Sequence, residues 1–201
     1  MNFFTADLHF GHANIIKYCS RPYSSVEEMD QALADNWNAT VTDDDDVWIL
    51  GDFTMKRGQV ARNYLLQLKG RKHLILGNHD YFAFKHPEQW QDVLVDIMRY
   101  KELKLGSGYT FTMMHFPLLF WNDSGKPHSI MLYGHIHSMP YCNAIAGKLY
   151  NALNVGVDVS GYKPLSEKEV LDKVSELNQT LQRSINGPQP LSMEEIARLG
   201  Y

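Results

Sequence analysis

Short apolar runs that stop at Gly, Asp or Asn constrain the fold of this chain more than any other feature of its sequence. The runs are rich in β-branched and aromatic residues, which is typical of strands. Their near-continuous apolar character indicates strands covered on both faces of a sheet. We therefore expect strands at Asn2–Ala6, Val47–Leu50, His73–Leu76, Tyr109–Met114, Ser129–Tyr133 and Leu149–Val155.

Helical patterns lie between these runs. Ser25 followed by Glu28 forms a capping box, and Ser166 followed by Glu169 forms another, so each pair predicts the start of a helix. Further helices are expected over 59–68 and, after a Gly-Pro breaker, from Ser192. Within 81–105 the interpretation is open, although the spacing of Trp90, Leu94 and Ile97 suggests a helix. Alternating strands and helices predict an α/β protein.

Length and composition set the broad class. With 201 residues and 44% hydrophobic composition, we expect a single domain over 1–201, of which about 184–201 is a C-terminal extension with the short helix. The net charge of -4 argues against a dedicated nucleic-acid-binding surface. The two cysteines are far apart, and neither a secretory signal nor a membrane-spanning run is evident, so we expect a soluble cytoplasmic protein without membrane partners.

Polar clusters follow five of the expected strands. They are Asp7-Leu8-His9 with Gly11-His12, Gly51-Asp52, Gly77-Asn78-His79-Asp80, His115, and Gly134-His135-Ile136-His137. Loops at the carboxyl edge of an α/β sheet project polar groups into a common crevice, so we expect these clusters to converge there.

Each cluster alone has an ordinary explanation. An Asp-x-His or Gly-Asp pair is more often a turn, and a lone histidine such as His115 is more often a satisfied core residue. Together, however, the clusters indicate a metal site, because His, Asp and Asn gather on converging loops. Eight oxygen and nitrogen candidates without a thiolate exceed what a structural zinc needs, which suits two divalent ions. Such donors favour Mn, Fe, Zn or Ni, and Mn is expected to support activity in vitro.

The order and spacing of these motifs, over residues 7–137, resemble the signature of the calcineurin-like metallophosphoesterases, particularly the compact bacterial and phage members. The later Asn154-Val155-Gly156 is similar to a segment of those members. The resemblance implies a four-layer α/β/β/α sandwich with two mixed sheets and a metal site at the carboxyl edge of the strands.

The resemblance also implies roles for the residues. One metal would be held by Asp7, His9 and His137, the other by Asn78, His115 and His135, and Asp52 would bridge them. His79 would stay off the metals and protonate the leaving group. Two further interpretations are open: Asp80 orients His79 or holds a turn, and His12 supports a ligand or begins a helix in solvent.

Two such metals would activate a bridging hydroxide for attack on a phosphodiester or phosphomonoester. We expect a small, possibly nucleotide-like substrate; the alternatives are a nuclease for single-stranded nucleic acid and a non-catalytic interaction scaffold. Aromatics after His79 and His115 are substrate-contact candidates, although core packing is the commoner role. They are Tyr81, Phe82, Phe84, Phe120 and Trp121, together with Asn122. Arg21, Lys56 and Arg57 could contact phosphate, but exposed charges are expected.

Overall fold

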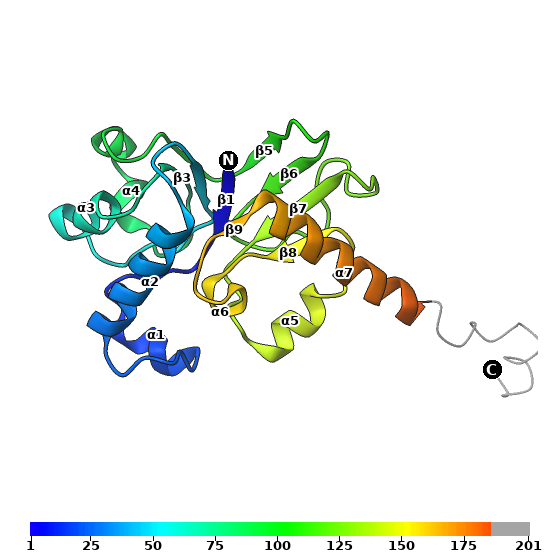
Figure 1. Ribbon diagram of the computed structural model, residues 1–201, viewed down its shortest axis with the longest axis horizontal. Coiled ribbons are helices and arrows are strands. Elements are labelled where there is room, and N and C mark those ends of the chain that lie inside the picture. The colour runs from blue at the N-terminus through cyan, green and yellow to red at the C-terminus, as the bar shows by residue number, and fades with distance from the viewer. Residues whose placement is uncertain (186–201) are drawn as a thin grey trace, which may run out of the picture.

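The computed structural model describes residues 1–185, which form two sheets with helices outside them (Figure 1). The elements in chain order are β1 (Asn2–Thr5), α1 (Ala13–Tyr18), α2 (Val26–Thr40), β2 (Asp46–Ile49), α3 (Gly58–Leu66), β3 (Arg71–Ile75), α4 (Tyr81–Phe84), the 3-10 helix η1 (Pro87–Trp90), β4 (Asp96–Met98), β5 (Lys101–Lys104), β6 (Thr110–Met113), β7 (Ser129–Tyr133), α5 (Pro140–Ala146), β8 (Ala152–Asn154), α6 (Val157–Ser160), β9 (Leu165–Ser166) and α7 (Glu167–Ile185).

Both sheets are mixed. The first has the order β4-β3-β2-β1-β9, in which only β9 is antiparallel to its neighbour. The second has the order β5-β6-β7-β8, in which β5 is antiparallel to β6 and the rest are parallel. Because β1, β2 and β3 run in parallel, as do β6, β7 and β8, the loops after these strands leave the sheets at their carboxyl ends.

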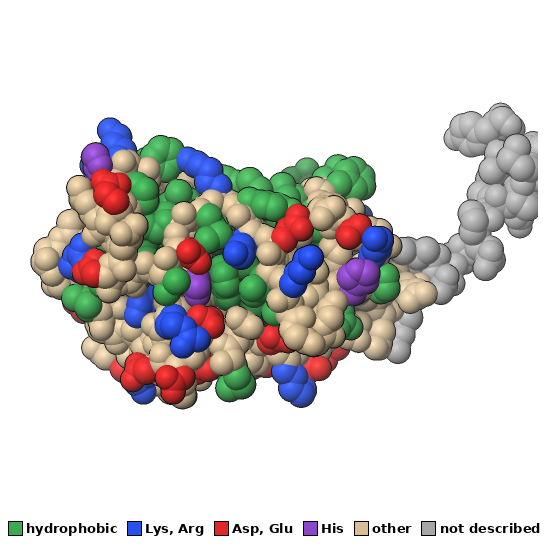
Figure 2. Space-filling view, turned by 90° about the horizontal axis from the view of Figure 1, so that it is seen from above, with side chains coloured by type: hydrophobic (Ala, Val, Ile, Leu, Met, Phe, Trp, Pro, Cys, Tyr) green, Lys and Arg blue, Asp and Glu red, His purple; other side chains and the backbone are tan. Residues whose placement is uncertain are grey.

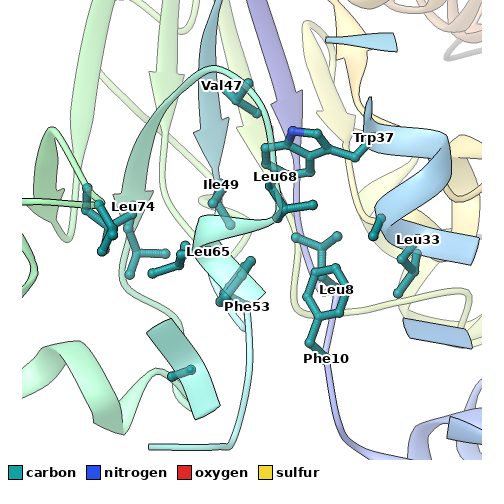
Figure 3. Close-up of a cluster of buried hydrophobic side chains, with 14 of the residues drawn as sticks. Leu8, Phe10, Leu33, Trp37, Val47, Ile49, Phe53, Leu65, Leu68 and Leu74 are labelled. Atoms are coloured by element: carbon teal, nitrogen blue, oxygen red, sulfur yellow. The ribbon is translucent and has the colours of Figure 1, made fainter. Parts of the chain in front are cut away.

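Three buried clusters account for the layers. The outer face of the first sheet packs on α2 and α3, where the fully buried Trp37 lies among Leu33, Ile49 and Leu65 (Figure 3). The inner faces of the two sheets meet in a second cluster, in which the rings of Phe4 and Phe111 pack edge to face at 5.1 Å. A third cluster covers the other face of the second sheet and includes Ala146 of α5. The four-layer sandwich is therefore confirmed.

Helix α7 lies along one end of the sandwich, where it contacts β9, β8 and β1. Its residues Val170 and Val174 join the cluster between the sheets. The helix begins with the predicted capping box, because the Glu169 carboxylate accepts hydrogen bonds from the backbone N–H of Ser166 at 2.8 Å and from its hydroxyl at 2.8 Å. No helix within residues 1–185 is long and apolar enough to cross a membrane.

Most expected elements are present with small shifts of their ends, and two need correction. The expected helix through Ile97 is wrong: Ile97 lies in β4, paired with Leu74, while Trp90 ends η1. Their helix-like spacing arises because Trp90, Leu94 and Ile97 all pack on the same core from different backbone conformations. The strand expected from Leu149 begins only at Ala152, after a left-handed turn at Asn151. The helix expected from Ser192 lies outside the described residues.

Candidate metal centre

The polar clusters lie on loops with an unusual backbone. Five candidate ligands have positive φ angles between 48° and 69°: Asp7, His9, Asp52, His135 and His137. Non-glycine residues rarely adopt this conformation, which costs on the order of 1–3 kcal/mol and persists where surrounding contacts impose it. Here the contacts are backbone hydrogen bonds between the loops, from Asp7 N–H to the Gly51 carbonyl at 3.0 Å and from His9 N–H to the Asp52 carbonyl at 2.9 Å.

Glycine is required where these loops pass each other. A Cβ on Gly77 would collide with the Asp52 carboxylate, and one on Gly51, whose φ is +89°, would collide with the ring of His115. The sequence places glycines just before ligand candidates, and the structure shows the reason: the backbone itself forms the wall against which the ligands rest.

The first ligand group consists of Asp7, His9 and His137, whose ligand atoms lie within 4.8 Å of one another. The Asp7 carboxylate is fully buried and accepts two hydrogen bonds, at 2.9 and 3.0 Å, from the backbone N–H of His135. Burial raises the pKa of Asp7 to about 6. Burial also lowers the pKa of His9 to about 3, so this histidine is neutral and offers lone pairs.

The second ligand group consists of Asp52, His115 and His135, again with ligand atoms within 4.8 Å. The backbone carbonyl of Leu50 lies 2.8 Å from Nδ1 of His115 and can only accept, so Nδ1 carries the proton. Nε2 is then the ring atom left for a metal, and it lies 3.1 Å from the Asn78 amide oxygen and 3.4 Å from the Asp52 carboxylate. Asn78 thus joins this group.

Asp52 lies between the two groups. Its Oδ2 is 3.4 Å from Nε2 of His115 and 3.6 Å from Nε2 of His9, while its Oδ1 accepts the backbone N–H of His79 at 2.8 Å. Burial pushes the pKa of Asp52 upward, but its contacts with His115 outweigh this effect and lower the pKa to about 2. A carboxylate in this position suits a bridge between two cations.

The donor set fits divalent cations. Both ring nitrogens of His9 are buried without a hydrogen-bond partner, although buried polar atoms are normally satisfied. Nε2 of His115 and the side-chain oxygens of Asn78 and Asp52 converge on one another, which costs energy unless a proton or a metal cation lies among them. The oxygen and nitrogen donors are those that Mn, Fe, Zn or Ni accept.

Two residues that support the centre were missed or misjudged at the sequence level. The Asp158 carboxylate of α6 accepts from Nδ1 of His137 at 2.7 Å, which leaves Nε2 as the donor atom for a metal. Burial alone would lower the pKa of His137, but this hydrogen bond is the largest of the contacts that raise it to about 10. The sequence around Asp158 contains no motif that indicates this role, because Asp158 lies after the last recognisable polar cluster.

Arg21 is the misjudged residue. It was expected as an exposed charge or a phosphate contact, yet it is only 4% exposed. Its guanidinium donates to Asp158 at 2.7 and 3.1 Å and to the carbonyls of Asp7 at 2.6 Å and Leu8 at 2.8 Å. Arg21 therefore ties the loop after β1 to the carboxylate that orients His137, and the expectation of exposure is wrong.

The residues with open roles lie around the ligands. The Asp80 carboxylate accepts three backbone N–H groups, those of Gly77, Asp52 and Phe53, at 2.8 to 2.9 Å, which favours the turn-holding interpretation over orientation of His79. The ring of His12 lies 5.5 Å from that of His9, beside the first ligand group. The ring of His79 lies 5.6 Å from His9, and its buried Nδ1 has no hydrogen-bond partner.

Asn154, in the segment noted from the sequence, also supports the centre. Its amide donates to the His137 carbonyl at 3.1 Å, while its side-chain oxygen accepts the N–H of Gly156 at 2.9 Å. Asn143 of α5 donates to the same carbonyl at 2.9 Å. These contacts hold the left-handed backbone at His137 in place.

Several known proteins are similar to this chain. An uncharacterized protein of Methanocaldococcus jannaschii is 37% identical over 170 residues, which cover 80% of this chain and 84% of the relative. The gene 66 protein of Mycobacterium phage L5 is 29% identical over 205 residues, covering 88% of this chain and 95% of the relative. A solved structure, a protein of unknown function from Aquifex aeolicus, has a TM-score of 0.67 and 25% identity, covering 87% of this chain and 98% of that one.

A family model described as calcineurin-like phosphoesterase matches residues 3–161, a range that contains both ligand groups, Arg21 and Asp158. The chain belongs to the calcineurin-like phosphoesterase family, whose members are typically metal-dependent hydrolases.

Proposed function

We propose that this protein hydrolyses phosphate esters of small or nucleotide-like molecules at a centre of two divalent ions. The observation that carries the proposal is the position of Asp52, whose Oδ2 lies within 3.6 Å of one histidine from each ligand group. In this arrangement Asp7, His9 and His137 hold one ion, Asn78, His115 and His135 hold the other, and Asp52 contacts both.

Charge explains why such a centre takes phosphate. Asp7 and Asp52 are the carboxylates of the two ligand groups, and the remaining ligands are histidines and an amide. Two divalent ions would therefore leave the site with a net positive charge. When bound, these ions supply Lewis acidity and lower the pKa of a coordinated water.

The chain itself supplies the remaining functions. Burial keeps His9 neutral, and the Leu50 carbonyl bound to Nδ1 of His115 leaves Nε2 as the ring atom for an ion. His79, whose Nδ1 has no protein partner, is placed to give a proton to the departing oxygen. Its backbone N–H is bound to Asp52, so the proposed acid and the proposed bridge are positioned together.

Net charge supports a small substrate over a nucleic acid. Figure 2 shows the face that carries the start of β1, whereas the metal ligands follow the other end of that strand; acidic and basic side chains are interspersed on the face shown. The net charge of the chain is -4, so the long-range field does not favour a polyanion.

The test is to load the metal-free protein with Mn²⁺, measure bound metal, and assay 4-nitrophenyl phosphate, bis(4-nitrophenyl) phosphate and a single-stranded oligonucleotide. We expect close to two ions per chain and turnover of at least one chromogenic ester. A fully active protein with one ion would contradict the binuclear centre. Turnover of the oligonucleotide far above the small esters would favour the nuclease alternative, and no turnover of any substrate would favour a scaffold.

A further inference from the structure

A cavity of about 420 Å³ opens beside the metal centre. It reaches from the ligand Asn78 to α4 and the loop between β4 and β5, and we call it the aromatic pocket. Its walls include Tyr81, Phe84, Lys85, Arg99 and Phe116. Its volume lies in the range that holds a drug-sized molecule. A substrate whose phosphate lies on the metal ligands can extend its organic part into this space.

Three aromatic rings of the pocket are exposed, which is costly unless something covers them. Tyr81 is 55% exposed, Phe84 51% and Phe116 37%. By contrast, Phe82 of the same short helix is only 8% exposed and packs against Trp90, so it is a core residue. The ring of Phe116 packs edge to face on that of His135 at 4.5 Å, which places this wall directly against a metal ligand.

The charge of the pocket selects an anion. Lys85 and Arg99 line it, and within residues 1–185 neither forms an ion pair with a carboxylate. The guanidinium of Arg99 lies over the Phe84 ring at 4.5 Å from its centroid. Asp80, the carboxylate in the wall, is 1% exposed and is occupied by three backbone N–H groups. The pocket thus combines flat apolar surface with unpaired positive charge.

We propose that the aromatic pocket binds the nucleoside part of a nucleotide substrate that carries a second phosphate besides the one hydrolysed. The base contacts the exposed rings of Phe84 and Phe116, and the second phosphate is bound by Lys85 and Arg99. Base–aromatic contact tolerates any base, because every base has a π-face. This inference rests on the proposed phosphoesterase activity, and it names the class of substrate for that centre.

The test compares three esters with one leaving group: methyl 4-nitrophenyl phosphate, thymidine 5′-(4-nitrophenyl) phosphate, and the same thymidine ester with a 3′-phosphate. In each, hydrolysis forms a bond from phosphorus to a water oxygen, breaks the bond to nitrophenolate, and releases a proton. We expect kcat/KM of the Mn²⁺-loaded protein to rise at each step, by about tenfold for the nucleoside and about threefold or more for the added phosphate. Equal values for all three esters would overturn the inference and leave the phosphoesterase proposal intact.

Matched variants locate the effect. Phe84→Leu should reduce the preference for thymidine over methyl by about five- to tenfold, whereas Tyr141→Leu, at a side chain 78% exposed outside the pocket, should retain it. Lys85→Gln and Arg99→Gln should reduce the gain from the 3′-phosphate, whereas Lys148→Gln, also exposed and outside the pocket, should not. Equal effects of the pocket variants and their controls would place the binding elsewhere.

A binding measurement decides the inference independently of turnover. Thymidine 3′,5′-bisphosphate and inorganic phosphate are titrated into the full chain by calorimetry, with and without Mn²⁺. We expect the bisphosphate to bind at least about tenfold more tightly than phosphate, and Phe84→Leu to remove most of the difference. If the two ligands bind alike, the pocket does not recognise nucleosides. If the bisphosphate binds as expected but no ester is hydrolysed, nucleoside binding by the aromatic pocket is supported and the proposed phosphoesterase activity is contradicted.

Discussion

Buried histidines occur in two regions of this protein, and their surroundings differ. Within β3, His73 is 7% exposed, and both ring nitrogens are satisfied, Nδ1 by Asp96 at 3.0 Å and Nε2 by Asp46 at 3.1 Å. Its ring stacks on Trp48 at 4.0 Å. At the carboxyl edge, His9 is 2% exposed, and neither nitrogen has a partner.

The difference shows that burial and residue type do not by themselves make a site. His73 lies on a regular strand whose neighbours, in register, bring carboxylates to both sides of the ring. His9 lies on a left-handed loop, where the backbone rather than the side chain is satisfied by the neighbouring loop. A buried nitrogen left without a partner at a strained backbone position is therefore the stronger sign of a ligand.

The comparison between the metal centre and the surroundings of His73 is tested most strongly by one substitution in each region. Asp52→Asn removes the negative charge shared by the two ligand groups, so we expect a loss of kcat/KM on the order of 10⁴-fold and fewer than two bound ions. Asp46→Asn makes the same chemical change beside His73 and should leave kcat/KM within about twofold, because the Asp46 carboxylate is bound to Arg71 and His73, away from both ligand groups. Circular dichroism checks folding, and an active Asp52→Asn protein would remove the bridge from the proposal.

The second prediction concerns His79, a histidine of the carboxyl edge that is proposed to act without binding metal. His79→Asn keeps the backbone N–H that Asp52 accepts, so both ions should remain bound. The rate should fall by about 10²–10⁴ for an alkyl ester, whose leaving alkoxide needs a proton, and much less for a nitrophenyl ester. The measurement is kcat/KM for the matched pair, with metal content determined on the same sample.

Three outcomes distinguish the roles of His79. Unequal losses favour the general acid, whereas equal losses on both esters favour electrostatic stabilisation of the transition state. A loss of metal in step with rate would make His79 a ligand.

The sequence predicted those elements that depend on residues close together in the chain. The strands before each polar cluster could be predicted because apolar runs, glycines and polar ends coincide within a few residues. The capping boxes at Ser25 and Ser166 are equally local, and in both helices the serine oxygen accepts the backbone N–H of the glutamate three residues later, at 3.2 and 3.3 Å.

The parts that could not be predicted depend on distant contacts. β4 and β5 are edge strands of three and four residues, and their apolar content is too small to define a period. The burial of Arg21 could not be predicted, because its partner Asp158 is 137 positions away in the sequence. The pocket residues Arg99 and Phe116 likewise meet only because β4 and the loop after β6 end beside the same site.

The third prediction concerns Asp158, a carboxylate bound to a histidine of the first ligand group. Asp158→Asn should weaken the hold on His137 and lower metal affinity or activity by about 10- to 100-fold. The matched change Asp96→Asn, at a carboxylate bound to the fully satisfied His73, should leave metal affinity unchanged. Metal titration of the two variants provides the comparison. Because Asp158 also holds Arg21, a fold check accompanies the measurement, and equal metal affinities in the two variants would contradict the orienting role.

The smallest effect is expected beside His73, and it is a change in the free energy of unfolding. The hydrogen bond from Arg71, followed by that of His73, holds the pKa of Asp46 below its usual value despite partial burial. A carboxylate with a depressed pKa stabilises the fold above its unfolded pKa of about 4, and this contribution is lost as pH falls through the lower folded value. Asp46→Asn should therefore cost about 1 kcal/mol of unfolding free energy at pH 7, because the pair is partly exposed. The difference between wild type and variant should shrink between pH 5 and pH 3, measured by urea unfolding of metal-free protein so that the ligand groups contribute equally to both. A difference that stays constant over this range would mean that the Asp46 charge does not stabilise the fold, and that Asp96 and packing on Trp48 hold the geometry around His73.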